Sequence, residues 1–323
     1  MCFLKILVTG GLGFIGSNFI RHMIAEHPDC TIINLDAMTY AGNPANLTDI
    51  EKNPRYSFVH GDICDRHTVE SVFLKHSIDT VVHFAAESHV DRSIQDSSAF
   101  VKTNVLGTQV ILDAALLHKC TRFIHISTDE VYGSTATGSF KEPDPLNPSS
   151  PYSASKAASD LLARAFYITH DLPVMVTRCT NNFGPYQFPE KLIPFFVINL
   201  LLDKKVPVYG TGKNVRDWIY VIDHCRAIDF VLHHGTAGEI YNIGSNNEMS
   251  NLEITHQILK LLRKDASCIE FVKDRPGHDW RYSLNSSKIR ALGWEPQTTF
   301  ETALKETVEW YVQHKGWWQP LLK

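Results

Sequence analysis

Short apolar runs recur through the first half of the chain, separated by longer stretches of helical periodicity. The runs occupy residues 3–9, 31–35, 56–60, 78–83, 121–126 and 174–178. Runs of this length predict buried strands. Their alternation with helical segments predicts a parallel sheet covered by helices on both faces. We therefore expect an α/β, doubly wound, Rossmann-like domain.

The clearest helical pattern lies between the fourth and fifth runs. Apolar side chains there recur with a spacing of about 3.6 residues, at Val101, Val105, Val110, Leu112 and Leu116. This spacing predicts an amphipathic helix over about 101–118. We expect a second long helix over 152–170.

The pattern changes beyond about residue 180. Prolines at 185, 189, 194 and 207 separate short elements. Helices are expected over 252–263 and 300–314, and brief strands near 206–209 and 239–243. We therefore expect two units, a sheet domain over 1–180 and a smaller C-terminal α/β lobe over 181–323.

Charge and length exclude some partners. The chain has 323 residues and a formal net charge of −4, without a basic stripe. No surface is thus available to neutralise a phosphate backbone or an anionic membrane, and we expect neither nucleic acid nor membrane as a partner. The apolar start, MCFLKILVTGG, reaches a Gly-rich turn after nine positions, which is too short for a signal or spanning segment.

Cysteine and histidine usage adds two expectations. The seven cysteines occur singly, without a C-x-x-C pair. A dispersed, odd set suits reduced thiols and a cytoplasmic location. The sixteen histidines include neither an H-E-x-x-H motif nor a Cys/His cluster at ligand spacing, so we expect no metal site.

A glycine-rich turn follows the first predicted strand. The segment TGGLGFIG places Gly10, Gly13 and Gly16 at the strand's end and opens a helix near Phe14. Such glycines let a pyrophosphate approach a helix N-terminus, where free N–H groups favour anions. Asp36 ends the second strand 20 residues after Gly16, where a carboxylate would bind the adenosine ribose hydroxyls. The combination predicts a dinucleotide site.

Asp36 also favours NAD over NADP. Its charge would repel a 2′-phosphate, and the next residue, Ala37, supplies no cation to hold one. The alternative is that the glycines only form a turn and Asp36 is a solvated loop acid. Asp62, after the third strand, is equally consistent with a contact to the adenine edge and with a helix N-cap.

Two later segments carry candidate catalytic groups. Tyr152 and Lys156 lie four apart on a predicted helix and therefore share one face. A neighbouring ammonium and a cationic nicotinamide would lower the pKa of the phenol, so that it can accept a hydroxyl proton. The alternative is an exposed helix on which this spacing occurs by chance.

The second segment, HISTDEVYG, places Thr128, Asp129 and Glu130 after the fifth apolar run, at the sheet edge where open α/β folds bind ligands. Adjacent Asp and Glu usually mark a solvated turn. In a confined site, however, two carboxylates cannot both ionise easily, so one could serve as an acid and the other as a base.

Taken together, these motifs resemble the extended short-chain dehydrogenase/reductase family and, within it, the dTDP-glucose 4,6-dehydratases. The resemblance runs nearly end to end. It rests on TGGLGFIG, FAAESHVDRSI, STDEVYG, YSASK, RCTNNFGPYQFPEKLIP, NVRDWIYVIDH and DRPGHDWRY. It implies a nucleotide-sugar 4,6-dehydratase that uses bound NAD as a transient hydride store and assembles as a homodimer through the helices near 101–118 and 152–170.

The resemblance also implies residue roles. Tyr152 would be the base at the sugar 4-hydroxyl, supported by Lys156, while Thr128 binds the substrate. Asp129 would protonate the leaving 6-hydroxyl and Glu130 would remove the C5 proton. Implied cofactor contacts, with the glycines, are Phe14, Ile15, Asp36, Asp62, Ile63, Ala85, Ala86, Thr103 and Asn182. Implied substrate contacts are Ser88, Asn181, Lys191, Leu192, Tyr209, Arg216, Asn251, Arg275 and His278.

Arg216 is expected to bind the diphosphate, because a planar guanidinium suits bidentate phosphate binding. The alternative is a surface ion pair with Asp217. Three other activities are less well supported. Nucleotide-sugar 4-epimerases need no acid/base pair after the Ser/Thr, UDP-glucuronate decarboxylases typically carry a Ser-Glu pair there, and a dinucleotide-sensing regulator needs no catalytic groups. The sequence leaves open whether the base is thymine or uracil, and whether the sugar is glucose or an N-acetyl relative.

Overall fold

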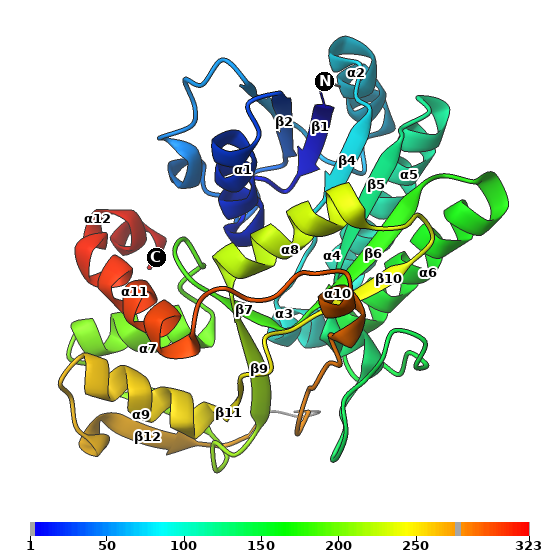
Figure 1. Ribbon diagram of the computed structural model, residues 1–323. Coiled ribbons are helices and arrows are strands. Elements are labelled where there is room, and N and C mark those ends of the chain that lie inside the picture. The colour runs from blue at the N-terminus through cyan, green and yellow to red at the C-terminus, as the bar shows by residue number, and fades with distance from the viewer. Residues whose placement is uncertain (1–3, 275–278, 323) are drawn as a thin grey trace.

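The computed structural model describes residues 4–274 and 279–322 and is built around a seven-stranded parallel sheet (Figure 1). The strand order is β10-β6-β5-β4-β1-β2-β3. The strands are β1 (Leu4–Thr9), β2 (Cys30–Asp36), β3 (Tyr56–His60), β4 (Thr80–His83), β5 (Arg122–Thr128), β6 (Val174–Cys179) and β10 (Ile240–Ile243). The first six match the six predicted runs, and the expected doubly wound fold is confirmed.

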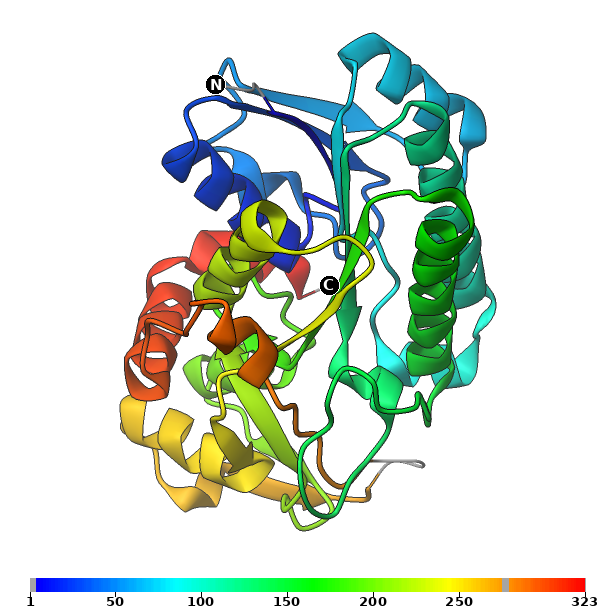
Figure 2. The same cartoon turned by 45° about the vertical axis from the view of Figure 1, so that its right-hand side comes forward.

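Helices cover both faces of this sheet, because successive side chains of each strand point to opposite sides. Ile6 and Val8 pack in the core beneath α1 (Phe14–Glu26) and α8 (Val221–His234). Leu7 belongs to the core on the other face, beneath α2 (Arg66–His76), α5 (Thr108–Leu117) and α6 (Pro151–His170). Figure 2 shows the two helical layers on opposite sides of the sheet.

The long apolar helix predicted at 101–118 is present, with an unexpected internal geometry. It runs from Ser98 to Leu117 as α4 (Ser98–Phe100), a π-helical segment η2 (Val101–Gly107) and α5. Its length and composition would suffice to cross a membrane, which is weak support for a span because half of it is buried inside the protein. π-Helical turns inside α-helices often mark functional sites.

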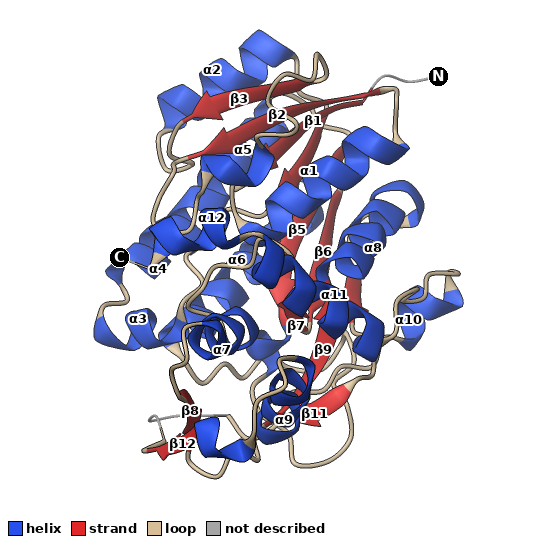
Figure 3. Ribbon diagram, turned by 90° about the vertical axis from the view of Figure 1, so that its left-hand side faces the viewer, coloured by secondary structure: helices blue, strands red, loops and turns tan. Residues whose placement is uncertain are grey.

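A second, smaller core lies below the sheet in the view of Figure 1. Its helices are α7 (Leu192–Leu201), α9 (Asn251–Leu261) and α11 (Phe300–Gln313), which Figure 3 shows packed around one another. Two small sheets accompany them. One contains β11 (Glu248–Ser250), β9 (Val215–Tyr220) and β7 (Asn181–Phe183); the other contains β12 (Ile269–Val272) and β8 (Val206–Tyr209). Short helices elsewhere include α3 (Val90–Gln95), η3 (Asp129–Tyr132), α10 (Ser287–Ala291) and α12 (Lys315–Trp318).

The chain returns to the first core after entering the second. β10 pairs in parallel with β6 and completes the large sheet, and α8 packs against α1. β10 and α8, which lie beyond residue 180, therefore belong to the first core. What positions the site is the edge formed by the carboxyl ends of β1, β2, β4 and β5, where open α/β sheets bind ligands.

Candidate active site

One elongated cavity of about 360 Å³ lies at this edge of the sheet. It brings together residues at or just after the ends of six strands, β1 to β6, and from the start of the second lobe. All of the predicted cofactor residues line it: Gly10, Gly13, Phe14, Ile15, Gly16, Asp36, Asp62, Ile63, Ala85, Ala86, Thr103, Tyr152, Lys156 and Asn182. The five predicted catalytic residues line it too, so both groups of side chains face one space.

The turn between β1 and α1 forms one end of the cavity. Gly10 has φ +71°, and a Cβ there would lie 2.7 Å from the backbone of Ala85. A Cβ on Gly16 would lie 2.5 Å from the Gly10 carbonyl oxygen. The N-cap of α1, Gly13, contributes no side-chain hydrogen bond, so the first-turn N–H groups remain available to an anion. The turn fits a pyrophosphate, and substitutions that add side chains would close it.

Asp36 lies at the end of β2 and is almost fully buried. Its two carboxylate oxygens accept the backbone N–H groups of Leu12 (2.9 Å) and Met38 (2.8 Å). Burial raises the pKa of Asp36, and these two hydrogen bonds oppose that rise. The alternative of a solvated loop acid is therefore wrong, and the carboxylate is fixed where it faces the cavity.

Asp62 also lines the cavity, and the alternative of an N-cap is wrong. The N-cap of α2 is Asp65, whose side chain accepts from His67 and Thr68. Asp62 instead accepts the Cys64 N–H at 2.9 Å and lies 3.7 Å from the Lys102 ammonium. Lys102 belongs to the π-helical segment, which also carries Thr103 into the cavity.

The catalytic segment begins where β5 ends. The Thr128 hydroxyl caps the short helix η3, accepting the Glu130 N–H at 3.3 Å and donating to Asp129 Oδ1 at 3.1 Å. Asp129 is only 3% exposed, and its Oδ2 atom has no hydrogen-bond partner among the described residues. Burial, and then the charge of Glu130, raise the pKa of Asp129 well above its usual value. The adjacent acids are not a solvated turn, and Asp129 favours its protonated form.

Tyr152 and Lys156 lie on the buried face of α6, so the alternative of an exposed helix is wrong. A capping box of Ser150 and Ser153 with Pro151 in the first turn starts this helix at a defined residue. Lys156 Nζ donates to the Ile126 carbonyl at 2.7 Å, and burial lowers its pKa to about 8.

The Tyr152 phenol carries no lowered pKa in the protein alone. Burial and the charge of Glu130 raise its pKa well above the usual value, and the hydrogen bond with Thr128 opposes this only in part. The Lys156 ammonium donates to the Ile126 carbonyl, and the pKa of the phenol is not lowered in the protein alone. A positive charge brought into the cavity would favour the phenolate.

The predicted substrate residues divide into three groups. Ser88, Asn181 and Lys191 line the cavity together with Thr128, and Lys191 Nζ donates to the Ser88 carbonyl at 3.1 Å. Leu192, Tyr209, Arg216 and Asn251 lie in the second lobe, outside the cavity lining. Arg275 and His278 lie outside the described residues.

Arg216 is buried and is not the surface ion pair that was the alternative. It is 5% exposed, stacks 4.3 Å above the Tyr282 ring and donates to the carbonyls of Val215 and Asp279. Asp217 is instead held by the backbone N–H groups of Asn246 and Asn247. The positive charge of Arg216 also opposes the rise in the pKa of Asp129, so the guanidinium lies electrostatically close to the catalytic acids.

A polar cluster over the cavity was not predicted. The Tyr40 hydroxyl donates to Glu190 at 3.1 Å, and the Arg92 guanidinium lies 3.8 Å above the Tyr40 ring. His89 lies 3.4 Å from Glu190. These contacts join the loop after β2 to the segment before α7. The only signal in the sequence was proximity, since Tyr40 follows Asp36 by four residues and Glu190 precedes Lys191.

Comparison with known proteins agrees with this geometry. The family model for GDP-mannose 4,6 dehydratase matches residues 7–307. The chain belongs to this family. The dTDP-glucose 4,6-dehydratase of Streptomyces niveus is 53% identical, with 98% of this chain and 96% of that protein aligned. The relative from Escherichia coli with the same name is 47% identical over 99% of this chain and 96% of its own.

Two solved structures share the architecture of this chain. The dTDP-glucose 4,6-dehydratase DesIV of Streptomyces venezuelae, crystallised with NAD and TYD bound, has a TM-score of 0.96 and 53% identity, covering 98% of this chain and all of that one. The UDP-glucose 4-epimerase of Thermus thermophilus, in complex with NAD, has a TM-score of 0.89 and 27% identity, covering 96% and 100%. A dehydratase and an epimerase therefore share this fold.

Proposed function

We propose that this protein is an NAD-dependent nucleotide-sugar 4,6-dehydratase, a hydro-lyase that converts dTDP-glucose or UDP-glucose to the 4-keto-6-deoxy sugar nucleotide. The observation that carries the proposal is Asp129, a buried carboxyl with a strongly raised pKa, next to Glu130 and in the same cavity as Tyr152. An acid, a second carboxylate and a phenol in one cavity are what C4 oxidation and water elimination require.

The cofactor half of the cavity supports NAD. The uncapped α1 N-terminus and the bare glycine turn fit a pyrophosphate, and Asp36 faces the place of the adenosine ribose. Bound NAD would supply a transient store for the hydride between C4 and C6, and a positive charge at its nicotinamide ring. That charge is the one that Tyr152 lacks in the protein alone.

The protein's own groups then act in a fixed order. Tyr152 accepts the proton of the 4-hydroxyl, while Thr128 orients the sugar and Lys156 contributes positive charge nearby. The C4 ketone makes the C5 proton acidic, and Glu130 removes it. Asp129 donates its proton to the departing 6-hydroxyl, which leaves as water. Glu130 finally returns a proton to C5. The reaction has no net redox change, because the hydride lost from C4 is regained at C6.

The rival activities of the same fold use the site differently. A 4-epimerase returns the hydride to C4 and has no use for a buried acid at position 129. A decarboxylase with a Ser-Glu pair likewise lacks this acid. Asp129 therefore favours dehydration over both, and the buried Tyr152 and Lys156 disfavour a regulator without catalysis.

We further propose a cytoplasmic homodimer in which 1–180 binds NAD and 181–323 binds the nucleotide-sugar. η2 and α5 pack beside α6, and these helices expose Val101, Leu117, Leu161 and Ile168. Exposed apolar side chains on adjacent helices suit a four-helix interface.

The test is to incubate purified protein with dTDP-glucose, UDP-glucose, their N-acetylated relatives and UDP-glucuronate, and to analyse the products by mass spectrometry and, for the C4 configuration, by NMR. The proposal expects loss of one water from at least one of the glucose nucleotides without added nicotinamide. Unchanged mass with an altered C4 configuration would support an epimerase instead, and loss of carbon dioxide from a glucuronate nucleotide would support a decarboxylase.

A further inference from the structure

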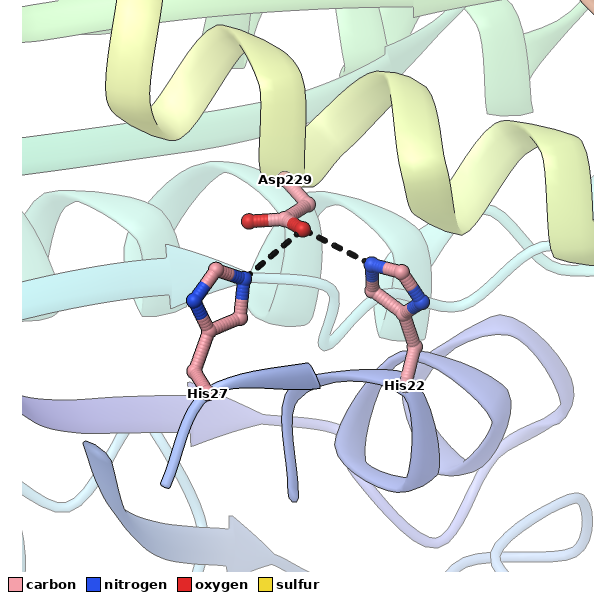
Figure 4. Close-up of side chains that lie close together, drawn as sticks. All are labelled: His22, His27 and Asp229. Carbon is pink, nitrogen blue, oxygen red and sulfur yellow. Dashed lines mark hydrogen bonds and ion pairs between the residues drawn. The ribbon is translucent and has the colours of Figure 1, made fainter. Parts of the chain in front are cut away.

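Three histidines surround one carboxylate far from the active site. His22, in the last turns of α1, and His27, just after it, each direct Nε2 at Asp229 on α8 (Figure 4). The Nε2 atoms lie 2.8 and 2.9 Å from the same oxygen, Oδ2. His233, one turn further along α8, places Nδ1 2.9 Å from the other oxygen, Oδ1. Neither the proposed reaction nor the cofactor site uses this cluster.

The donor atoms are arranged as a chelate. Three donor atoms, one each from His22, His27 and Asp229, all lie within 4.8 Å of one another. In a tetrahedral zinc site with bonds of about 2.0–2.1 Å, neighbouring donors lie about 3.3 Å apart. The hydrogen-bonded pairs at 2.8 and 2.9 Å therefore need to separate by only a few tenths of an ångström to admit an ion.

From this geometry we infer that His22, His27 and Asp229 form a binding site for a divalent transition metal of the zinc class, which joins the end of α1 to α8. Two imidazoles and one carboxylate favour such ions over Mg²⁺ or Ca²⁺, which prefer all-oxygen sites. Water would complete the coordination, because His27 and His233 keep 30% and 32% of their side chains exposed.

His233 lies beside two of the proposed ligands, Asp229 and His27, without being a ligand itself. Its Nδ1 lies 3.0 Å from the Asp229 carbonyl oxygen as well as 2.9 Å from Oδ1, and its ring stacks on His27 at 4.8 Å. Groups that hold a ligating carboxylate and orient a ligating imidazole in this way tune metal sites. The nearby cations are already engaged: Arg55 donates to the carbonyls of Ile24 and His27, and Arg122 to that of Leu232.

The role of the site would be structural. α1 begins at the proposed pyrophosphate site and has 13 residues, so its far end lies about 20 Å from the cofactor. A metal there cannot touch the substrate, but it would fix α1 against α8. No local motif indicates this site, because Asp229 is more than 200 residues from either ligating histidine along the chain.

The test compares zinc-dependent stability in the purified, NAD-loaded enzyme after EDTA treatment. Adding Zn²⁺ should raise the Tm of the parent protein by at least ~2 °C, and Mg²⁺ should not. The double variant His22→Gln/His27→Gln should lose the zinc-induced rise. His256→Gln, which changes an exposed histidine on α9, should keep it. The double variant also loses the hydrogen bonds of His22 and His27 to Asp229. The quantity compared is therefore the zinc-induced change in Tm within each protein.

A spectroscopic measurement tests the coordination geometry and the absence of thiolate ligands in the parent protein, even if the double variant fails to fold. Co²⁺ titration should give one set of tetrahedral d–d bands per chain, without a thiolate charge-transfer band, and Zn²⁺ should displace it. No saturable Co²⁺ spectrum, a thiolate band, or an equal zinc-induced rise in the double variant would each overturn the assignment. In those cases the three histidines only share hydrogen bonds with Asp229.

Discussion

At the scale of single residues, the site depends on polar groups held in a buried environment. Burial and the neighbouring charge of Glu130 raise the pKa of Asp129. Burial also lowers the pKa of Lys156, to about 8. Residue types and spacing were enough to propose both groups. They were not enough to place the Lys156 ammonium at the Ile126 carbonyl, since that contact depends on how α6 packs on β5.

The first prediction concerns Asp129→Asn. C4 oxidation should persist, while dehydration should slow by roughly 10²–10⁴-fold, the usual contribution of a positioned general acid. The parent rate should also fall as pH rises through the raised pKa of Asp129, because the proton needed by the leaving hydroxyl is then lost. Pre-steady-state absorbance of the reduced cofactor and product analysis across pH would measure both. A variant that dehydrates at the parent rate would remove Asp129 from the mechanism.

The same substitution should stabilise the protein. A carboxyl whose pKa is raised on folding binds more protons in the folded than in the unfolded state, so stability falls as pH rises between the two pKa values. Above that range Asp129→Asn, which carries no charge, should have a higher Tm than the parent. Asp171→Asn, at an exposed residue, is the matched control and should leave the Tm unchanged. A lower Tm for Asp129→Asn would mean that the buried charge of Asp129 does not destabilise the folded protein.

Asp36 leads to a prediction about cofactor choice. NAD should bind at least ~100-fold more tightly than NADP, because a 2′-phosphate would be set against a buried carboxylate. Calorimetric titration of the apo-protein measures both affinities, and Ala37→Arg should narrow the difference by supplying a cation. Equal affinity in the parent would contradict the assignment of Asp36 to the ribose.

At the scale of elements, the turn between β1 and α1 does most to create the site. The sequence predicts this turn, because the spacing of its glycines and their place after a strand are specific. The sequence does not predict the π-helical geometry of Val101–Gly107, since the apolar periodicity of this segment is close to that of an ordinary α-helix. Nor could the sequence show that β10 joins the large sheet, because a four-residue apolar strand does not reveal its partner.

Gly10→Ala tests this turn against a matched control. Gly138 has a similar φ of +73° but no atom within 4 Å of an added Cβ, whereas Gly10 has φ +71° and the backbone of Ala85 at 2.7 Å. Both variants should lose about 1–2 kcal/mol for the left-handed backbone, and Gly10→Ala should lose about 1–3 kcal/mol more through overpacking. Only Gly10→Ala should weaken NAD binding. Urea unfolding and calorimetry would show this, and equal losses would contradict the role of close approach.

At the scale of the whole molecule, the chain passes from the first core to the second and back again. The sequence predicted the two-unit organisation from a change in pattern, but it could not show α8 crossing back to pack on α1, because that contact joins residues about 200 positions apart. Asn181 and Lys191 of the second lobe line the same cavity as Thr128, and the charge of Arg216 opposes the rise in the pKa of Asp129.

The dimer interface can be tested on one face of α6. Leu161 and Ile168 are seven residues apart, and are 57% and 68% exposed. The double variant Leu161→Asp/Ile168→Asp should be a folded monomer by analytical ultracentrifugation and circular dichroism, since charges cannot be buried in an apolar interface. Leu74→Asp, at a residue on α2 that is 69% exposed, should leave the mass unchanged. A monomeric parent protein, or an unchanged dimer in the double variant, would contradict this interface.

The central claim is that Tyr152, Glu130 and Asp129 act in one cavity on one sugar, so that the hydride removed from C4 returns to C6. The direct measurement is turnover of dTDP- or UDP-glucose deuterated at C4 in ordinary water, followed by NMR of the product. The account predicts deuterium at C6, protium from solvent at C5 and no consumption of external nicotinamide. Deuterium retained at C4 would indicate an epimerase, deuterium released into free reduced cofactor would indicate a simple dehydrogenase, and either result would contradict the account.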